Sequence, residues 1–139
     1  AWDLYCGVGG FAQTVARNLP GCPVTGVEIS REAVEAARID APANAHFVAA
    51  DAAAYAEERP LPELLVVNPP RRGLDASLCS ALEAGSTRWL LYSSCNAATL
   101  ARDLARLTSM EVVRARVFAM FPQTAHSETL VLCRRREGR

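Results

Sequence analysis

Short hydrophobic runs alternate with helix-forming segments along most of the chain. The apolar runs predict five buried strands, at residues 2–5, 24–29, 46–50, 64–67 and 89–92. The segments after them predict five helices, at residues 12–19, 31–40, 52–58, 75–84 and about 98–107. Strands and helices that alternate in this way form a parallel sheet with helices on both faces. The pattern therefore predicts a single α/β domain over residues 1–139.

The last two apolar runs have no helix between them. They cover residues 112–120 and 129–133 and are joined only through residues 121–128. So short a link requires an antiparallel pair, and the last strand then begins at the edge where the parallel strands end. Ligands of α/β sheets bind at this edge. The residues that we expect there are Gly7, Glu28, Asp51, Asn68, Cys95 and Glu128.

The helix boundaries follow local signals. Pro20 ends the first helix, and Ser30 is placed to cap the second. Apolar residues on one side of each helix are expected to pack against the sheet, and these include Leu19 in the first helix and Ile39 in the second.

A glycine-rich turn follows the first strand. Gly7, Gly9 and Gly10 fall within four residues, just before a helix. Glycines in such a turn let the backbone approach a ligand closely, because no Cβ intervenes. The turn lacks the Gly-Lys-Ser/Thr ending of a phosphate loop and the spacing of the dinucleotide fingerprint. It suits a nucleotide cofactor without phosphates, such as S-adenosylmethionine (SAM), and a turn without any ligand is the alternative.

Acidic residues follow the second and third strands. Glu28 lies 18 residues after Gly10, where nucleotide-binding α/β folds place an acidic residue that accepts hydrogen bonds from ribose hydroxyls. We favour that role over a solvated loop glutamate. Asp51 could accept a hydrogen bond from an adenine amino group or could cap the helix that follows it, and the sequence favours neither role.

An Asn-Pro-Pro motif, residues 68–70, follows the most strand-like run of the chain. Prolines stiffen this loop and offer no N–H, so that carbonyl groups stay free, and Asn68 can both donate and accept hydrogen bonds. Arg71 and Arg72 come next. Contacts between this pair and nucleic-acid phosphates are as plausible as a solvated pair.

Cys95 is the candidate nucleophile. It stands between the fifth strand and a helix, where both the strand end and the helix dipole favour a thiolate. A buried structural cysteine is the alternative. The remaining cysteines are expected to be packing residues, Cys6, Cys22, Cys79 and Cys133. An odd number of cysteines without a Cys-x-x-Cys motif predicts neither a disulfide framework nor a metal site, and it favours a reducing, cytoplasmic compartment.

The net charge is zero but is unevenly distributed. Residues 1–70 carry four arginines against nine acidic residues, and residues 71–139 carry eleven arginines against six. An acidic half suits a cationic cofactor and a basic half suits a polyanion such as RNA, although drift in composition explains the charge equally well. No run is long and apolar enough to span a bilayer, and no secretory signal is present. Neither a membrane nor an obligate protein partner is expected.

Five motifs together resemble the catalytic domain of the RNA uracil-C5 methyltransferase family. They are Asp-Leu-Tyr-Cys-Gly-Val-Gly-Gly-Phe at 3–11, Gly-Val-Glu-Ile at 26–29, Asn-Pro-Pro-Arg-Arg-Gly at 68–73, Tyr-Ser-Ser-Cys-Asn at 92–96 and Met-Phe-Pro-Gln-Thr-Ala-His-Ser-Glu at 120–128. They cover the chain in order, and the third and fourth are most similar to the 23S ribosomal RNA branch. The resemblance implies a Rossmann-like class I SAM methyltransferase fold, with a mostly parallel seven-stranded sheet and an antiparallel last strand.

The resemblance also implies residue roles. Cys95 would be the nucleophile and Glu128 the proton acceptor, with His126 either orienting Glu128 or structural. The residues that would contact or line the SAM pocket are Tyr5, Gly7, Gly9, Glu28, Asp51 and Asn68. The expected reaction is methylation of C5 of a uridine in RNA, with 23S rRNA as the expected substrate and 5-methyluridine as the product. No metal is expected in residues 1–139.

Family members usually carry an N-terminal RNA-binding domain. Many also hold an iron–sulfur cluster through four cysteines, and a SAM-contacting glutamine precedes the first strand. None of these features lies in residues 1–139, and the chain starts inside a predicted core strand without an initiator Met. We therefore expect the chain to be the catalytic domain of a longer protein, with any iron–sulfur cluster in the preceding region.

Two other functions compete with this interpretation. N6-adenine and N4-cytosine methyltransferases also use Asn-Pro-Pro, but they place an aromatic residue after the second proline, where this chain has Arg71. An inactive SAM-fold module that only binds RNA is the second alternative. The presence of both Cys95 and Glu128 argues against it.

Overall fold

A computed structural model describes residues 1–119 and 127–138 of the chain. The strands are β1 (Trp2–Leu4), β2 (Val24–Glu28), β3 (Ala45–Ala49), β4 (Leu64–Val67), β5 (Trp89–Ser94), β6 (Met110–Ala119) and β7 (Ser127–Arg135). The helices are α1 (Gly10–Asn18), α2 (Arg31–Arg38), α3 (Ala52–Glu57), α4 (Ala76–Ala84) and α5 (Ala97–Arg106). Each helix of the set follows one of the first five strands.

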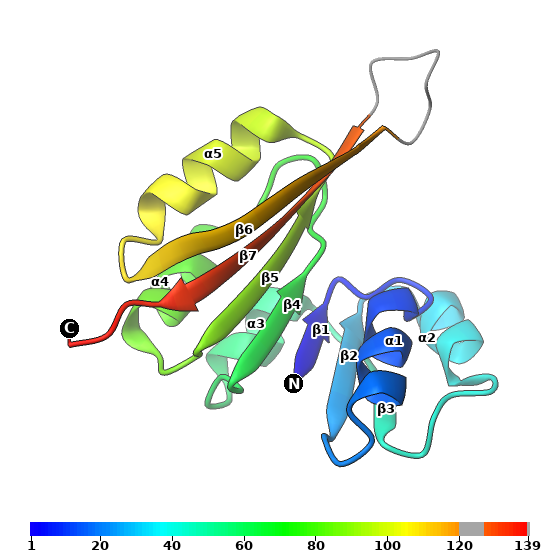
Figure 1. Ribbon diagram of the computed structural model, residues 1–139. Coiled ribbons are helices and arrows are strands. Elements are labelled where there is room, and N and C mark those ends of the chain that lie inside the picture. The colour runs from blue at the N-terminus through cyan, green and yellow to red at the C-terminus, as the bar shows by residue number, and fades with distance from the viewer. Residues whose placement is uncertain (120–126, 139) are drawn as a thin grey trace.

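All seven strands form one sheet, in the order β3-β2-β1-β4-β5-β7-β6 (Figure 1). Strands β1 to β5 pair in parallel, and β7 runs antiparallel to both β5 and β6. The chain builds outward from β1 to β3 and then returns to β4 on the other side of β1. This reversal leaves a crevice at the carboxyl ends of β1 and β4, where α/β sheets bind their ligands.

Two hydrophobic cores lie on opposite faces of the sheet. Helices α1 and α2 cover one face of the first three strands, and their small residues pack against Phe47 of β3, which is 4% exposed. Helices α3, α4 and α5 cover the other face along most of its width, where leucines of helices and strands pack around the fully buried Tyr92 of β5. The predicted fold class, with its antiparallel last strand, is confirmed.

The prediction that Leu19 and Ile39 pack against the sheet is wrong. Leu19 and Ile39 are 48% and 69% exposed, because α1 ends at Asn18 and α2 ends at Arg38. Each of them is therefore the residue that ends its helix, and its side chain no longer follows the buried stripe. The capping prediction is confirmed, since the Ser30 hydroxyl accepts a hydrogen bond from the Ala33 N–H.

The sheet is covered unequally. No helix among residues 1–119 and 127–138 lies over the face of β5, β7 and β6 that points away from α5 (Figure 1). This face carries half-buried Leu91, Leu130 and Leu132 beside exposed Arg114 and Arg116. No helix in the described part of the chain is long and apolar enough to cross a membrane.

Candidate active site at the carboxyl edge of the sheet

The glycine turn has the backbone that its sequence predicts. Gly7 and Gly9 have φ values of +56° and +88°, in the left-handed region that glycine tolerates without strain. A Cβ on Gly9 would lie 2.7 Å from the Phe47 ring, so this glycine lets α1 pack closely on the sheet. A Cβ on Gly7 would meet no heavy atom within 4 Å. The space in front of Gly7 is therefore open to a ligand.

Glu28 ends β2 and holds the glycine turn. One carboxylate oxygen accepts from the Gly7 N–H at 3.2 Å and the other from the Ser30 N–H at 2.9 Å. Each oxygen has a second lone pair, so Glu28 can still accept hydrogen bonds from a ribose. The structure thus gives Glu28 a positioning role that the sequence did not predict, beside the ribose role that remains a prediction.

Asp51 is the N-cap of α3. Its Oδ1 accepts from the Ala54 N–H at 2.9 Å, which is the capping alternative left open by the sequence. Asp51 also lines the cavity beside the glycine turn. Capping through one oxygen leaves the second available to an adenine amino group, so the two roles are compatible.

A cavity of about 270 Å³ opens between the ends of β1, β2 and β3 and the loop after β4. Its lining includes Tyr5, Glu28, Asp51 and Arg72. The Tyr5 hydroxyl is buried and has no hydrogen-bond partner among the described residues. Burial also raises the pKa of Tyr5 to about 12, so the phenol stays protonated and can donate. An unpartnered donor, two carboxylates and an open glycine turn fit a nucleoside with hydroxyl and amino groups.

Asp3 lies beneath this turn, inside β1. It is 1% exposed, and its Oδ2 accepts from the Ala12 N–H at 2.9 Å, while Oδ1 has no partner in the part of the chain that the structure describes. Burial raises the pKa of the Asp3 carboxyl to about 7, although the Ala12 N–H lowers it in part. Asp3 thus ties the start of α1 to β1 and is protonated far more readily than an ordinary aspartate.

Asn68 is the first residue after β4. Its side chain is exposed, and its backbone N–H donates to the Leu4 carbonyl of the neighbouring strand β1 at 3.4 Å. The following turn closes through a hydrogen bond from the Gly73 N–H to the Pro70 carbonyl at 2.9 Å. Arg71 and Arg72 are both exposed, and Arg72 lies 3.8 Å from Asp75 in an ion pair. Both arginines are therefore accessible to a polyanion.

Cys95 and Glu128 lie at the same end of one strand pair. The last pair of β5 and β7 joins Ser94 to Thr129, so that Cys95 follows it on one strand and Glu128 precedes it on the other. Cys95 is exposed, and Glu128 is partly buried. The Ser93 hydroxyl donates to Glu128 Oε1 at 2.7 Å, which holds the carboxylate across the strands. The sequence prediction that both groups reach the carboxyl edge is confirmed in placement.

The other cysteines are also free thiols. Cys6, Cys79 and Cys133 are buried, as predicted for packing residues, and Cys22 is partly exposed. Burial raises the pKa of Cys133 to about 11 and that of Cys6 to about 12, so these thiols are poor nucleophiles. In the described ranges no group of three or more His, Cys, Asp or Glu residues could hold a metal ion. His126 lies outside the described residues.

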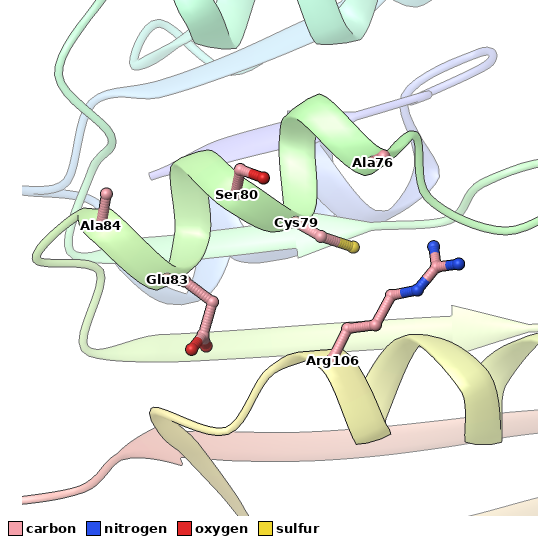
Figure 2. A pocket seen from close by; sticks show the side chains of 6 residues that line it. All are labelled: Ala76, Cys79, Ser80, Glu83, Ala84 and Arg106. Carbon is pink, nitrogen blue, oxygen red and sulfur yellow. The ribbon is translucent and has the colours of Figure 1, made fainter.

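A larger hollow, of about 560 Å³, lies away from this edge, in the groove between α4 and α5 (Figure 2). Its polar groups are Ser80, Glu83 and Arg106 on the helices, with the Cys79 thiol pointing toward Arg106. Glu83 already accepts from the Ser109 hydroxyl and N–H, so it joins α4 to the start of β6. Glu83 thus has a structural role, and none of the predicted site residues lines this hollow.

Comparison with known proteins identifies the family. The family model described as tRNA (Uracil-5-)-methyltransferase matches residues 2–136. The chain belongs to this family. Among curated relatives, the 23S rRNA (uracil(747)-C(5))-methyltransferase RlmC of Halothiobacillus neapolitanus is 46% identical over 139 residues, and RlmC of Cronobacter sakazakii is 44% identical over 136. Each match covers 94% of this chain and 36% of the relative, so the chain spans about a third of their length.

Solved structures agree with this family. The Pyrococcus abyssi tRNA (uracil-54, C5)-methyltransferase, in complex with S-adenosyl-L-homocysteine, superposes with a TM-score of 0.82 at 31% identity. The match covers 95% of this chain and 33% of that one. TrmN from Thermus thermophilus, at 20% identity and a TM-score of 0.70, shares the fold. The class I methyltransferase architecture expected from the family resemblance is confirmed.

Two polar residues that support this edge were not predicted from the sequence, Ser93 and Asp103. Ser93 was part of a recognised motif, but only the strand register shows that its hydroxyl meets Glu128. Asp103 is completely buried on the packing side of α5. A signal existed for Asp103, since it stands three residues after Leu100 and four before Leu107, within the apolar stripe of the helix.

Proposed function

We propose that the chain is the catalytic domain of a SAM-dependent methyltransferase that modifies C5 of a uridine in RNA. The family match and the relatives at 44–46% identity, which are named 23S rRNA uracil-C5 methyltransferases, support 23S rRNA as the substrate. The observation that carries the proposal is the common position of Cys95 and Glu128 at one end of the β5–β7 pair. A thiol and a carboxylate at one point are what this reaction needs.

The cofactor would lie in the cavity beside the glycine turn. Glu28 would accept from the ribose hydroxyls, Asp51 from the adenine amino group, and Tyr5 would donate to the cofactor through its unpartnered hydroxyl. Gly7 and Gly9 would let the backbone approach, and Asn68 would face the methyl-bearing end from the loop after β4. SAM supplies an electrophilic methyl group, carried on a sulfonium, to the carbon that attacks it.

The chain's own residues would supply the remaining chemistry. Uracil C5 is a weak nucleophile, but when the Cys95 thiolate adds to C6, the electron pair displaced from the C5–C6 double bond makes C5 enolate-like. After C5 gains the methyl group it still carries its proton. Glu128 would take that proton, the C5–C6 double bond would re-form, and the thiolate would leave C6. Ser93 would keep the Glu128 carboxylate pointed along the strand ends.

A covalent trap tests this proposal in the full natural protein. Ribosomal RNA that carries 5-fluorouracil has fluorine at C5, and Glu128 cannot remove fluorine as it removes a proton. After incubation with SAM, a denaturing gel should therefore show an RNA–protein adduct that is absent from Cys95→Ala. Cys79→Ala is the matched control, because Cys79 is a buried thiol on the helix face and should leave the adduct intact.

The outcomes separate the reaction classes. An adduct that depends on Cys95 would support both the C5 reaction and the nucleophile. No adduct from a protein that still binds SAM would overturn the proposal. Transfer of labelled methyl groups to adenine or cytosine amino groups would then identify the rival Asn-Pro-Pro class.

A further inference from the structure

Asp103 is a buried carboxylate that the proposed chemistry does not use. It is 0% exposed on α5, 25 residues before Glu128, and none of its hydrogen-bond partners lines the cofactor cavity. An isolated buried carboxylate is costly unless its oxygens are hydrogen-bonded. Asp103 accepts from the Tyr92 hydroxyl at 2.6 Å, the Leu74 N–H at 2.8 Å and the Arg102 guanidinium at 3.0 Å. These donors come from β5, from the turn after β4 and from α5 itself.

The turn after β4 is shaped to reach Asp103. Gly73 has a φ of +83°, and a Cβ at this position would lie 2.5 Å from Asp103 Oδ2 and 2.6 Å from Arg102 Nη2. A side chain at position 73 would push the turn away from α5. The glycine of the Arg-Arg-Gly sequence therefore allows the Leu74 N–H to meet the carboxylate.

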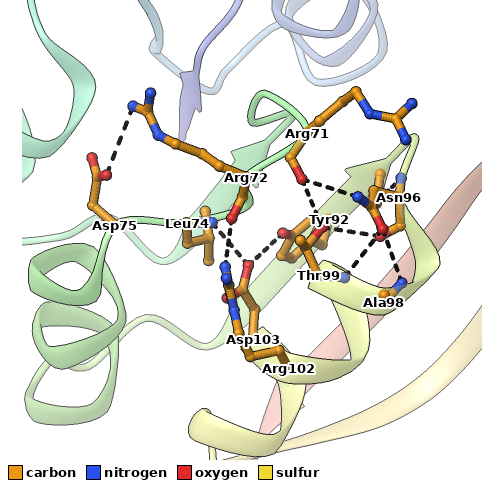
Figure 3. Close-up of polar contacts among 11 residues, drawn as sticks. Arg71, Arg72, Leu74, Asp75, Tyr92, Asn96, Ala98, Thr99, Arg102 and Asp103 are labelled. Atoms are coloured by element: carbon orange, nitrogen blue, oxygen red, sulfur yellow. Dashed lines mark hydrogen bonds and ion pairs between the residues drawn. The ribbon is translucent and has the colours of Figure 1, made fainter.

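Side chains of α5 and of its N-cap, Asn96, bind the same turn. The Arg71 carbonyl accepts from the Thr99 hydroxyl at 3.0 Å and the Asn96 amide at 3.3 Å (Figure 3). The Arg72 carbonyl accepts from Arg102 Nη2 at 2.5 Å, and Arg102 in turn lies against Asp103. Three neighbouring backbone groups of the turn are thus bound by side chains of α5 and its cap.

This network joins the loop of Asn68, on the cofactor side of the site, to the turn of Cys95, the proposed nucleophile. Asn96, which binds the Arg71 carbonyl, directly follows Cys95, and the turn that it binds begins two residues after Asn68. The turn and α5 are otherwise separated by about 25 to 30 residues of chain, so their spacing is set by these contacts and not by local geometry. A displacement of about 1 Å between reacting groups can cost roughly a hundredfold in rate.

We propose that Asp103 is a positioning residue, which fixes the Asn68 loop against the Cys95 turn and so sets the distance between the methyl donor and the pyrimidine. The inference rests on the proposed function. Asp103 touches neither reactant. It acts on the backbone of the turn directly at Leu74 and, through Arg102, at Arg72.

The test compares Asp103→Asn with Arg106→Ala in the full natural protein. Arg106 lies on the same helix but lines the outer groove, so its loss should leave the turn in place. Asparagine keeps the size of the side chain but offers one carbonyl oxygen in place of a carboxylate, and its NH₂ cannot accept from Arg102. The fluorouracil adduct counts the competent molecules in each preparation, and single-turnover methyl transfer to natural RNA, at saturating SAM and RNA, gives the rate per competent molecule.

We expect Asp103→Asn to lower this rate roughly 10- to 100-fold. The SAM dissociation constant should stay within about threefold of wild type, because Asp103 bonds to none of Tyr5, Glu28 and Asp51, the residues that would bind the cofactor's polar groups. A merely structural role would lower the count of competent molecules and leave the rate of each unchanged. A transfer rate per competent molecule within twofold of wild type would therefore overturn the inference. Absence of any adduct from wild type would instead refute the proposed function.

A second variant covers the case in which Asp103→Asn does not fold. Thr99→Val keeps the shape of a half-buried side chain and removes the hydroxyl, which lies 3.0 Å from the Arg71 carbonyl and 3.1 Å from the Asn96 carbonyl. It should slow single-turnover transfer roughly three- to tenfold, as expected for the loss of one hydrogen bond. A wild-type rate in Thr99→Val, together with an unfolded Asp103→Asn, would assign the network to stability alone and reject the inference.

Discussion

The two halves of the active-site edge are held in different ways. In the half that would bind the cofactor, Glu28 holds Gly7 and Ser30, Asp51 caps the helix that follows it, and Asp3 holds Ala12. These partners are 2 to 21 residues apart. In the half that would perform the chemistry, Ser93 meets Glu128 and Asp103 meets Leu74, across 35 and 29 residues.

The sequence separation of these partners decides when each half can form during folding. A cofactor half built from a strand, a turn and the next strand can form as the local chain folds, because its contacts close short loops. The catalytic half exists only after β5, β7 and α5 have assembled around the turn that follows β4. We therefore expect substitutions in the first half to change cofactor affinity and substitutions in the second to change the rate of reaction.

Glu128→Gln should have the largest effect. The amide still accepts from Ser93 but cannot take the C5 proton, and loss of a general base lowers turnover roughly 10²- to 10⁴-fold. RNA with ordinary uridine should then stay attached to Cys95 on a denaturing gel, while calorimetric SAM affinity is unchanged. Glu111→Gln on neighbouring β6, a partly exposed glutamate paired with Arg134, is the control. Wild-type turnover by Glu128→Gln would remove Glu128 as the base.

Glu28→Ala should weaken SAM binding roughly 10- to 100-fold, because it removes the ribose acceptor and frees the Gly7 N–H. Isothermal titration calorimetry measures the change. Glu32→Ala, an exposed carboxylate in the first turn of α2, should bind SAM as wild type does. An unchanged affinity in Glu28→Ala would exclude Glu28 from the cofactor site and break the comparison between the halves.

Asp3 should make the stability of the cofactor half depend on pH. Burial raises the pKa of Asp3 to about 7, while an unfolded aspartate titrates near 3.9. The folded protein thus retains a proton that the unfolded chain has lost, and the free energy of unfolding falls as pH rises from about 4 to about 7. Relative to Asp3→Asn, which cannot ionise, wild type should lose up to about 1.4 kcal/mol per pH unit within that window.

Urea unfolding of both proteins at several pH values between 5 and 8 measures this difference. The comparison between the two proteins cancels every group that they share. A stability difference that does not change with pH would show that Asp3 ionises in the folded protein as it does in water.

Asp51→Asn should have the smallest effect. Asparagine caps a helix about as well as aspartate, so the free energy of unfolding should change by less than about 0.5 kcal/mol. If the second oxygen accepts from the adenine amino group, SAM affinity should fall roughly three- to tenfold. Asp51→Ala, which loses the cap as well, should also be destabilised by about 1 kcal/mol. Unchanged SAM affinity in Asp51→Asn would leave Asp51 as a cap alone.

The order of the elements, the glycine turn and the edge on which the candidate residues meet could all be predicted from the sequence. This was possible because hydrophobic period, glycine and proline positions and helix caps act over a few residues, and parallel strands bring their carboxyl ends to one edge. The prediction was wrong at Leu19 and Ile39, because each helix ends one residue before the last apolar residue of its pattern.

Which polar groups form hydrogen bonds with one another could not be predicted without the three-dimensional structure. The hydrogen bond from Ser93 to Glu128 depends on the register of β5 against β7, and the network at Asp103 depends on α5 packing over the turn after β4. Such contacts join segments about 30 residues apart, and the same residues placed in another register would face other partners. Composition and hydrophobic period determine the secondary structure of each segment, and tertiary packing determines the distances between the polar groups of the candidate site.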